Sequence, residues 1–407
     1  MNNLRATESH HDLIHTKSDN PKKTVELSYN HGIIIRETLF RFTFLERCAA
    51  HDSESGVFKM VTIKQIAAEL DVSPTTVSNV IHGNTKEVSP QTIQRVRKKI
   101  EELQYIPNMN ARSLARSSSK IIGLIIRYPT MEGKNVVQDP FNSELIGVIE
   151  DEVRKLGYFL MLYASDKADE IQKMAITWNV DGIISLGLNA AECRKMKENL
   201  KIPLVFIDCY FQDDDESYTN VGLKDRECAK RITEYLIGMG HKKIAFLADN
   251  RVGVDYERWQ GYREALAEHH IPVPKNDFFQ IGFGTAGIIK TYDVVCQRIR
   301  EFTALFFASD YYASFAVNYF FDKGIRVPED ISVVGFDDNI FARNTRPRLT
   351  TMRQNPSEKG RTAVAQVLRL INNENIPVHN IRLDTELVIR DSVKDIGKQT
   401  ARRFMHR

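Results

Sequence analysis

Three short stretches near the start of the chain place apolar residues at helical spacing. Each stretch opens with a helix-start signal. Thr62 and Gln65 form a capping box, and Ser73 and Ser89 are each an N-cap residue followed by a proline. The apolar residues expected to face inward are Ile63, Ile66, Ala67, Leu70, Val77, Val80, Ile81, Ile93, Val96, Ile100 and Leu103. Because only residues 71–73 separate the first two stretches, the sequence predicts three short helices with a tight turn between the first two.

The second predicted helix carries short polar side chains on its outward positions. These residues are Thr75, Thr76, Ser78 and Asn79. A tight helix-turn-helix places one helix in the major groove of DNA, where such side chains reach base edges and phosphates. An ordinary three-helix bundle with a polar outer face explains the same residues, so both interpretations stay open at this point.

A short segment with a helical pattern follows Pro107. It runs from Asn108 to Arg116 and is followed by three serines at 117–119. One or two helical turns are not stable alone in water. The segment is therefore either a linker or a helix that forms only against DNA and a second copy of itself.

From residue 120 onward, apolar runs of strand length alternate with amphipathic helical patterns. The strand-like runs are 121–126, 158–163, 182–186, 204–207, 243–247, 279–282, 304–307 and 332–335. The helical patterns are 141–156, 168–178, 190–200, 224–239, 257–269, 286–300, 312–323 and 357–373. Regular alternation predicts βαβ units and parallel sheets, and about 290 residues are too many for one doubly wound sheet. We expect an α/β core of two similar lobes with the ligand site in the cleft between them, beyond the carboxyl ends of the strands.

Charge adds one observation to this picture. Residues 60–119 hold 8 Lys/Arg and 5 Asp/Glu, whereas residues 1–59 hold 8 of each and residues 120–407 hold 40 of each. The whole net charge of +3 therefore lies in the block with the short helices. Its basic residues include Arg95, Arg97, Lys98, Lys99, Arg112 and Arg116. So small an excess is often only a solvated face, and it favours nucleic-acid binding only together with the helix pattern.

Several classes of protein are not indicated. The five cysteines, Cys48, Cys193, Cys209, Cys228 and Cys296, are widely spaced and predict neither a disulfide framework nor a zinc site, but reduced buried thiols. The longest apolar stretches, 33–35 and 121–126, are far shorter than the roughly 18 residues of a membrane helix, and residues 1–30 lack a secretory core. We therefore expect a soluble cytoplasmic protein with no membrane contact, no metal and no cofactor.

One glycine motif suggests nucleotide binding. Residues 282–287 read GFGTAG between a strand and a helix, and Asp310 lies about 20 residues further on, as in a dinucleotide fingerprint. The motif lies deep in the chain, and glycines are common in such turns. An oxidoreductase therefore remains an alternative that rests on this hexapeptide alone. No P-loop, GxSxG or HExxH motif is present, so we do not expect an enzyme.

Charged residues at predicted strand and helix ends suit a polyol ligand. A carboxylate of the pair Asp337-Asp338 accepts hydrogen bonds from sugar hydroxyls, and the guanidinium of Arg258 donates them. An acid pair, a metal site and plain salt bridges explain these residues as well.

The motifs match a known family. The chain resembles the LacI/GalR bacterial transcriptional regulators from about residue 61 to residue 390. The matching segments are VTIKQIAAELDVSPTTVSNVI (61–81), YIPN (105–108), ARSL (111–114), VDGII (180–184), GHKKIA (240–245), ER (257–258) with GY (261–262), VPEDISVVGFDD (327–338) and LTT (349–351). The resemblance raises DNA binding above the plain-bundle and linker interpretations.

The resemblance implies a homodimer on a roughly palindromic, double-stranded operator. It makes Thr75, Thr76 and Asn79 the readers of the major groove and Ser73 and Ser78 phosphate anchors. It implies that the segment from Asn108 to Arg116 is a hinge helix whose contact face carries Ala111 and Leu114. The side chain of Leu114 is then expected to insert into a central minor-groove step of the operator. The remaining residues expected at the DNA are Thr62, Lys86 and Arg112.

For the core, the resemblance implies a fold like the periplasmic sugar-binding proteins with an effector in the cleft. The residues expected at the effector are Asp208, Arg258, Ser309, Asp310 and Asp337, with Phe141 or Phe283 as an apolar wall. Family effectors are mostly sugars or sugar phosphates, with purines a minority and a phosphocarrier protein rarer. This sequence departs from the pattern in a longer loop at 127–139 and in Ser309, where an asparagine is frequent.

These inferences give a division of the chain. We expect a poorly ordered extension at 1–59 with Met60 as a candidate initiator, a helix-turn-helix domain at 60–106, a hinge and linker at 107–119, a core at 120–393 and a basic tail at 394–407. Within the core, lobe 1 covers about 120–220 and 354–393 and lobe 2 about 221–347. The expected function is a dimeric repressor of carbohydrate uptake or catabolism genes, without the leucine-heptad tail of a tetramer. The rival is a ligand-binding module of the periplasmic type without a regulatory role.

Overall fold

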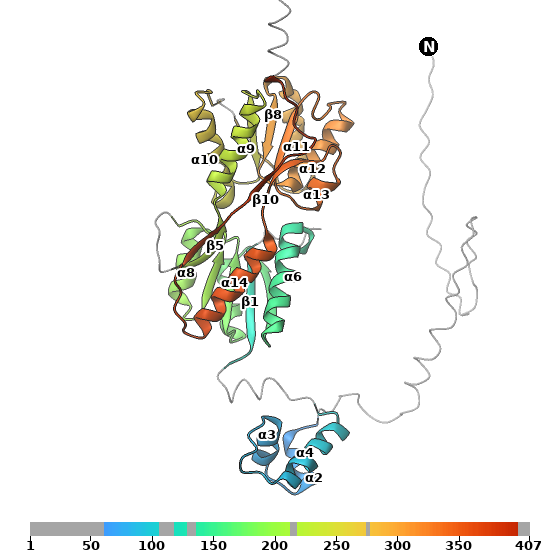
Figure 1. The fold of residues 1–407 in the computed structure, drawn as a ribbon, viewed down its shortest axis with the longest axis vertical. Coiled ribbons are helices and arrows are strands. Elements are labelled where there is room, and N and C mark those ends of the chain that lie inside the picture. Colours follow the sequence, from blue (N-terminus) through green and yellow to red (C-terminus); the bar gives the residue numbers. More distant parts are fainter. Residues whose placement is uncertain (1–60, 106–117, 128–135, 212–217, 274–276, 398–407) are drawn as a thin grey trace, which may run out of the picture. The chain divides into compact units, whose positions relative to one another are not determined.

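A computed structural model describes residues 61–105, 118–127, 136–211, 218–273 and 277–397. The described residues divide into two compact units on either side of the boundary between Ile106 and Pro107. Each unit is described by itself below, and Figure 1 shows its elements. The expected extension at 1–59, Cys48, the hinge residues Asn108, Ala111, Arg112 and Leu114, and most of the expected tail lie outside the described residues.

The first unit is a three-helix headpiece. Its helices are α2 (Ile63–Leu70), α3 (Pro74–Ile81) and α4 (Pro90–Glu102). The expected capping box at Thr62 and the N-caps at Ser73 and Ser89 are all present. α2 ends at Asp71, whose left-handed backbone (φ 52°) makes the tight turn into α3. The headpiece has its own apolar core around Ile66, Val77 and Val96, so the predicted helices are confirmed.

Ser73 provides the first stability prediction. Its Oγ accepts a hydrogen bond from the Thr76 backbone N–H at 3.0 Å, which satisfies a donor that the helix itself cannot. We expect Ser73→Ala to destabilise the headpiece by about 1 kcal/mol. Hydrogen exchange of the α3 amides in the full chain measures this, with Ser73→Asn as a variant that keeps a capping side chain. Equal exchange in the alanine variant and the parent chain would contradict the assignment of the cap.

The second unit contains two six-stranded sheets with the same strand order. The first sheet runs β11-β5-β4-β3-β1-β2 and the second runs β12-β10-β9-β8-β6-β7. The strands are β1 (Ile121–Arg127), β2 (Phe159–Ser165), β3 (Gly182–Leu186), β4 (Leu204–Ile207), β5 (Thr219–Leu223), β6 (Ile244–Ala248), β7 (Phe278–Gln280), β8 (Ala304–Phe307), β9 (Ser332–Asp337), β10 (Thr350–Arg353), β11 (Asn380–Leu383) and β12 (Glu386–Val388). All strand pairs are parallel except β10 with β12, and they confirm the expected pair of parallel-sheet lobes.

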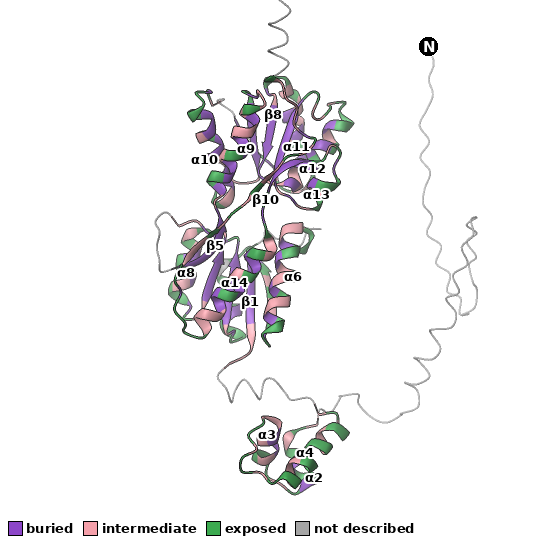
Figure 2. Ribbon diagram, in the orientation of Figure 1, coloured by how far each residue is buried: buried purple, intermediate pink, exposed green. Residues whose placement is uncertain are grey.

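Helices cover both faces of each sheet and bury the strands between them, as Figure 2 shows. The helices are η1 (Val136–Gln138), α6 (Pro140–Lys155), α7 (Ala168–Thr177), α8 (Ala190–Asn199), α9 (Asp225–Gly238), α10 (Gly253–Glu268), α11 (Gly284–Gln297), η2 (Ile299–Glu301), α12 (Asp310–Asp322), α13 (Ile340–Asn344) and α14 (Pro356–Ile371). In the first lobe, α6 and α14 share one apolar cluster with the sheet, and α7 and α8 share the other. In the second lobe, α9 and α10 cover one face and α11 and α12 the other.

The chain passes between the lobes three times: after β5, after β10 and after β11. This pattern differs from the expected boundaries. The assignment of all of 354–393 to lobe 1 was wrong, because β12 pairs with β10 of the second lobe. Residues beyond it also pack there, since Lys394 N–H donates to Ser332 Oγ at 3.0 Å and Ile396 N–H donates to Met239 O at 2.9 Å. The first residues of the expected tail, from 394 onward, therefore belong to the second lobe.

Two of the described cysteines lie closer together than their spacing in the sequence suggests. Cys193 and Cys209 are both buried, and their Sγ atoms lie 3.0 Å apart as free thiols. Burial raises the pKa of Cys193, so its protonated thiol is favoured. Among the described residues, no three His, Cys, Asp or Glu side chains are arranged to hold a metal ion. No helix in the described ranges is long and apolar enough to span a membrane.

Candidate functional site

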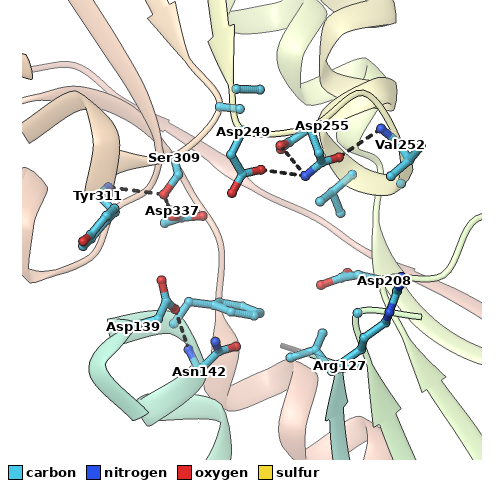
Figure 3. A pocket seen from close by; sticks show the side chains of 18 of the residues that line it. Arg127, Asp139, Asn142, Asp208, Asp249, Val252, Asp255, Ser309, Tyr311 and Asp337 are labelled. Atoms are coloured by element: carbon cyan, nitrogen blue, oxygen red, sulfur yellow. Dashed lines mark hydrogen bonds between the residues drawn. The ribbon is translucent and has the colours of Figure 1, made fainter. Parts of the chain in front are cut away.

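The strands of both lobes end at a shared cleft of about 410 Å³. Arg127, Asp208 and Asp337 come from the carboxyl ends of β1, β4 and β9, and Asp249 and Ser309 follow β6 and β8. The first turns of α6 and α10 complete the lining, as Figure 3 shows. A cavity of this size with convergent polar groups fits a small polar ligand.

Arg258 is a buried cation at this cleft. It lies on α10 with 6% of its surface exposed, and its guanidinium stacks 3.5 Å above the ring of Phe336. Nε donates to Asp225 Oδ1 at 2.7 Å, and Nη1 donates to the carbonyl oxygen of Ala308 at 2.6 Å. Burial disfavours the charge, but the attraction of Asp225, Asp337 and Asp255 outweighs it and raises the pKa of Arg258. The guanidinium is therefore fixed, charged and part of the cleft lining.

The two neighbouring aspartates after β9 have different environments. Asp337 lines the cleft and accepts hydrogen bonds from Ser309 Oγ at 3.1 Å and Gln354 Nε2 at 2.6 Å. Asp338 lies behind it, where it accepts from Arg353 Nε at 2.7 Å and Arg390 Nη2 at 2.5 Å. Burial alone would raise the pKa of Asp338, but the hydrogen bonds and charges of these arginines outweigh it and lower the pKa. The pair is thus one cleft carboxylate and one structural salt bridge, not an acid pair.

Asp208 lies in a buried ion pair that the sequence analysis missed. Lys359 on α14 is fully buried, and its Nζ donates to both carboxylate oxygens of Asp208 at 2.8 and 2.7 Å. The same Nζ donates to Gln354 Oε1 at 3.1 Å. Lys359 lies four and eight residues before Ala363 and Val367, so all three share one face of the helix. This spacing was the signal in the sequence that the side chain of Lys359 faces inward.

The headpiece presents a polar face on α3. Val77 and Val80 are buried against α2 and α4, whereas Ser73 and Thr75 are exposed and Thr76, Ser78 and Asn79 are partly exposed. Thr75, Thr76 and Asn79 are spaced so that they share one side of the helix. Thr62 and Lys86 are exposed as well. This face has the size and the donor and acceptor groups that a major groove accommodates.

Comparison with known proteins identifies the family. Residues 62–108 match the profile of bacterial regulatory proteins of the lacI family, and residues 233–393 match a periplasmic binding protein-like domain. The chain is 32% identical to the probable HTH-type transcriptional repressor ExuR of Bacillus subtilis (strain 168), over 82% of this chain and 99% of that protein. It is 30% identical to the HTH-type transcriptional regulator MalR of Clostridium butyricum, over 83% of this chain and 100% of that protein. The chain belongs to the LacI family.

Solved structures of the LacI family agree in fold. The lac repressor dimer bound to operator and the anti-inducer ONPF has a TM-score of 0.71 and 25% identity, over 83% of this chain and 100% of that chain. The complex of the transcriptional regulator CelR with cellobiose has a TM-score of 0.62 and 25% identity, over 82% and 99%. As a member of the LacI family, this chain is a DNA-binding transcriptional regulator and not an enzyme. The oxidoreductase alternative is thereby excluded.

The glycine motif that suggested the oxidoreductase has a packing role. Gly282 and Gly287 face each other where β7 leads into α11, and a Cβ added to Gly282 would lie 2.8 Å from the carbonyl oxygen of Gly287. Neither glycine lines the cleft of this LacI-family core. The glycines are needed because the two backbone segments approach closely.

The cleft contains five of the seven residues expected at the effector. Those that line it are Phe141, Asp208, Arg258, Ser309 and Asp337. Phe283 does not line the cleft; it lies at the start of α11, where its side chain is 58% exposed. Asp310 does not line it either, because it is fully buried and accepts from the Asp338 N–H at 2.7 Å and Thr351 Oγ1 at 2.8 Å. Missed lining residues include Arg127, Asp139, Asn142, Asp249, Asn250, Asp255, Tyr312 and Gln354.

Asp337 gives a pH-dependent prediction for the LacI-family core. Burial raises its pKa from 3.8 to about 6, although Arg258 opposes the shift. A carboxyl group whose pKa is higher in the folded than in the unfolded state destabilises the folded state when it ionises. For Asp337 this loss of stability begins near pH 4 and is complete above about pH 6. We expect Asp337→Asn to stabilise the ligand-free core by on the order of 2 kcal/mol at pH 7.5 and by clearly less at pH 4.5.

Urea unfolding at these two pH values, followed by the fluorescence of Trp178 and Trp259, measures the difference. A gain of equal size at both pH values would show that Asp337 ionises at its ordinary pKa in the folded core.

Proposed function

We propose that this chain is a cytoplasmic, dimeric repressor of carbohydrate uptake or catabolism genes that binds a palindromic operator and responds to a small molecule in its cleft. The observation that carries the proposal is the combination of two sites in one chain. A folded headpiece exposes the polar face of α3, and a two-lobed core encloses a ligand-sized cleft. If the chain were only a ligand-binding module without a regulatory role, the presence of a folded headpiece with this polar helix face would have no explanation.

The proposed DNA contacts follow from the headpiece. Thr75, Thr76 and Asn79 read base edges, while Ser73 and Ser78 contact phosphates. Thr62 and Lys86, which are both exposed, are proposed as further backbone contacts. The Oγ atoms of Ser73 and Thr76 lie 2.9 Å apart, so the N-cap also orients a reading residue. Asn108, Ala111, Arg112 and Leu114 keep their proposed hinge roles, with Leu114 as the minor-groove wedge, at the cost of a few kcal/mol for each unstacked step.

The proposed effector contacts span both lobes. Phe141 and Asp208 belong to the first lobe, and Arg258, Ser309 and Asp337 belong to the second. A ligand held by both sets favours one arrangement of the lobes. A regulator needs only a difference in affinity between two such arrangements, and the same difference then acts on operator binding. Sugars and sugar phosphates are the proposed effector class, with a purine or a phosphocarrier protein as the alternatives.

The proposed dimer has a candidate contact surface in the first lobe. Large apolar residues are exposed on the end of α6, on the edge strand β2 and at the end of α7. They are Leu156, Phe159, Leu162, Ile176 and Trp178, with 38 to 60% of their surface exposed. α6 and α7 both pack against β2, and exposed apolar patches commonly mark contacts between proteins.

We expect the double substitution Phe159→Glu/Trp178→Glu to weaken the dimer by about 30-fold or more, because truncated or charged central anchors cost at least about 2 kcal/mol. Val378→Glu, at a residue 54% exposed elsewhere in the lobe, is the matched control and leaves the dimer intact. Sedimentation equilibrium of the three proteins measures the dissociation constants. An unchanged dimer in the double variant would place the interface on another surface.

Selection of DNA from a random duplex library tests the proposed function. The full chain is used at near-physiological salt, with and without a mixture of sugars and sugar phosphates. We expect an inverted repeat with a pyrimidine–purine centre, since such steps kink easily. If no sequence is enriched in either condition, the proposal of an operator-binding repressor fails.

A further inference from the structure

The cleft contains more carboxylates than cations. Five aspartates and two arginines line it: Asp139, Asp208, Asp249, Asp255, Asp337, Arg127 and Arg258. In Figure 3, Asp139 and Asp208 of the first lobe lie across the cleft from Asp249, Asp255 and Asp337 of the second. The charge balance of this surface therefore bears on which ligand enters.

The cations at the cleft are already paired with carboxylates of the protein. Arg258 pairs with Asp225 at 2.7 Å, and Arg127 pairs with Glu192 at 3.1 Å. The fully buried Lys359 pairs with the carboxylate of Asp208 at 2.7 Å. These three pairs offer an incoming ligand no net positive charge.

The other four aspartates have no ion-pair partner within the part of the chain that the structure describes. Each accepts hydrogen bonds from neutral donors: Asn142 N–H to Asp139 at 2.9 Å, Tyr312 Oη to Asp249 at 2.9 Å, Asn250 Nδ2 to Asp255 at 3.0 Å and Gln354 Nε2 to Asp337 at 2.6 Å. Arg258 attracts Asp255 and Asp337, but Asp225 already balances its charge. A carboxylate offers about four acceptor positions, so these groups keep acceptor capacity for a ligand.

These carboxylates also repel one another across the cleft. Burial raises the pKa of Asp139, and the charge of Asp249 in the other lobe raises it further. Burial likewise raises the pKa of Asp337, and Asp139 adds to the shift. The pKa of Asp255 is raised by burial and, to a smaller extent, by the charge of Asp249. A positive group placed between these carboxylates would relieve the repulsion.

We propose that the effector of this cleft is a polyhydroxylated amine, with an amino sugar as its simplest form, whose ammonium group lies among Asp139, Asp249 and Asp255. Its hydroxyl groups are held by Asp337, Ser309 and Arg258, and its apolar ring face by Phe141. A phosphate or carboxylate group on the ligand would meet four unpaired aspartates and is rejected. The inference rests on the proposed function, because it takes the cleft as the effector site, and it narrows the effector class within it.

Titration calorimetry of the full chain without DNA tests the inference. The ligands are glucosamine, galactosamine and mannosamine, each compared with its parent hexose and with the 6-phosphate and uronate of that hexose. We expect at least one amino sugar to bind about ten-fold or more tightly than its parent, and no phosphate or uronate to bind more tightly than the parent. The double variant Asp249→Asn/Asp255→Asn should lose this preference, with the amino sugar and its parent hexose binding with similar affinity.

Asp322→Asn removes one negative charge from an exposed position on α12 outside the cleft and serves as the control for overall charge. It should keep the preference of the parent chain. The inference is overturned if a phosphate or uronate binds more tightly than its hexose. It is overturned as well if no amino sugar binds more tightly than its hexose, or if the preference survives in the double variant. Each of these results leaves the DNA-binding proposal untouched, because that proposal is tested by selection of DNA.

Discussion

Replacing Arg258 with alanine destabilises the core by about 3–5 kcal/mol and abolishes the response to the effector, because it leaves the buried Asp225 without its cation. The side chain of Asp225 is fully buried and that of Arg258 is 7% exposed, so solvent cannot replace the lost partner. The substitution also removes the hydrogen bond to Ala308 and the stacking on Phe336. Urea unfolding followed by the fluorescence of Trp259 on the same helix measures the loss.

Two further variants separate the structural role of Arg258 from its role in binding. Arg226→Ala breaks the exposed pair with Glu264 on the same two helices and should cost less than about 1 kcal/mol. Arg258→Ala/Asp225→Asn removes both charges, so it should recover much of the stability but none of the effector response. If Arg258→Ala costs no more than Arg226→Ala, the buried pair does not support the core. A normal effector response in either Arg258 variant would remove this residue from the binding site.

Replacing Asn79 with alanine should weaken specific operator binding by about 30-fold or more. A side chain that reads a base edge contributes about 1–3 kcal/mol, and a dimer on a palindrome loses that contribution twice. Asn79 lies beside the buried Val80 but is itself partly exposed, so the helix should fold normally without its amide. Fluorescence anisotropy with a selected palindrome and with a scrambled duplex measures the specific and non-specific affinities.

The matched control for Asn79 is Gln94→Ala, at an exposed position on α4 of the same headpiece. It should leave both affinities unchanged. A similar loss of affinity on the scrambled duplex would show that Asn79 contacts the backbone of DNA and not a base.

The headpiece could be predicted from the sequence because its signals are local. The capping residues Thr62, Ser73 and Ser89 act on amides no more than three residues away, and each was found at its expected place. The long apolar strands were equally clear. β5, β10, β11 and β12 were missed because none of them has a strong pattern of its own, and β5 and β11 are an example. They pair with each other through contacts such as Asn220 N–H to His379 O at 2.7 Å, which join segments about 160 residues apart.

The cleft was only partly predictable for a related reason. Arg258 and Asp337 were found because they stand at a predicted helix start and a predicted strand end, and the family resemblance then placed them at the effector. The resemblance also placed Asp310 at the effector, but its carboxylate accepts hydrogen bonds from the loop after β9 and lies against Gly335. Asp249 and Asp255 were missed because an aspartate after a strand or in the first turn of a helix usually serves only the backbone. Their role depends on the opposite lobe, which no local pattern reveals.

Hydrogen exchange of the full chain with and without a selected operator duplex tests the central claim most directly. That claim is that this LacI-family regulator reads its operator through α3 (Pro74–Ile81). The account predicts strong protection of amides in α3 and in the hinge segment 107–119, with smaller changes in the core. Protection confined to other surfaces, with α3 exchanging as in the free protein, would contradict it.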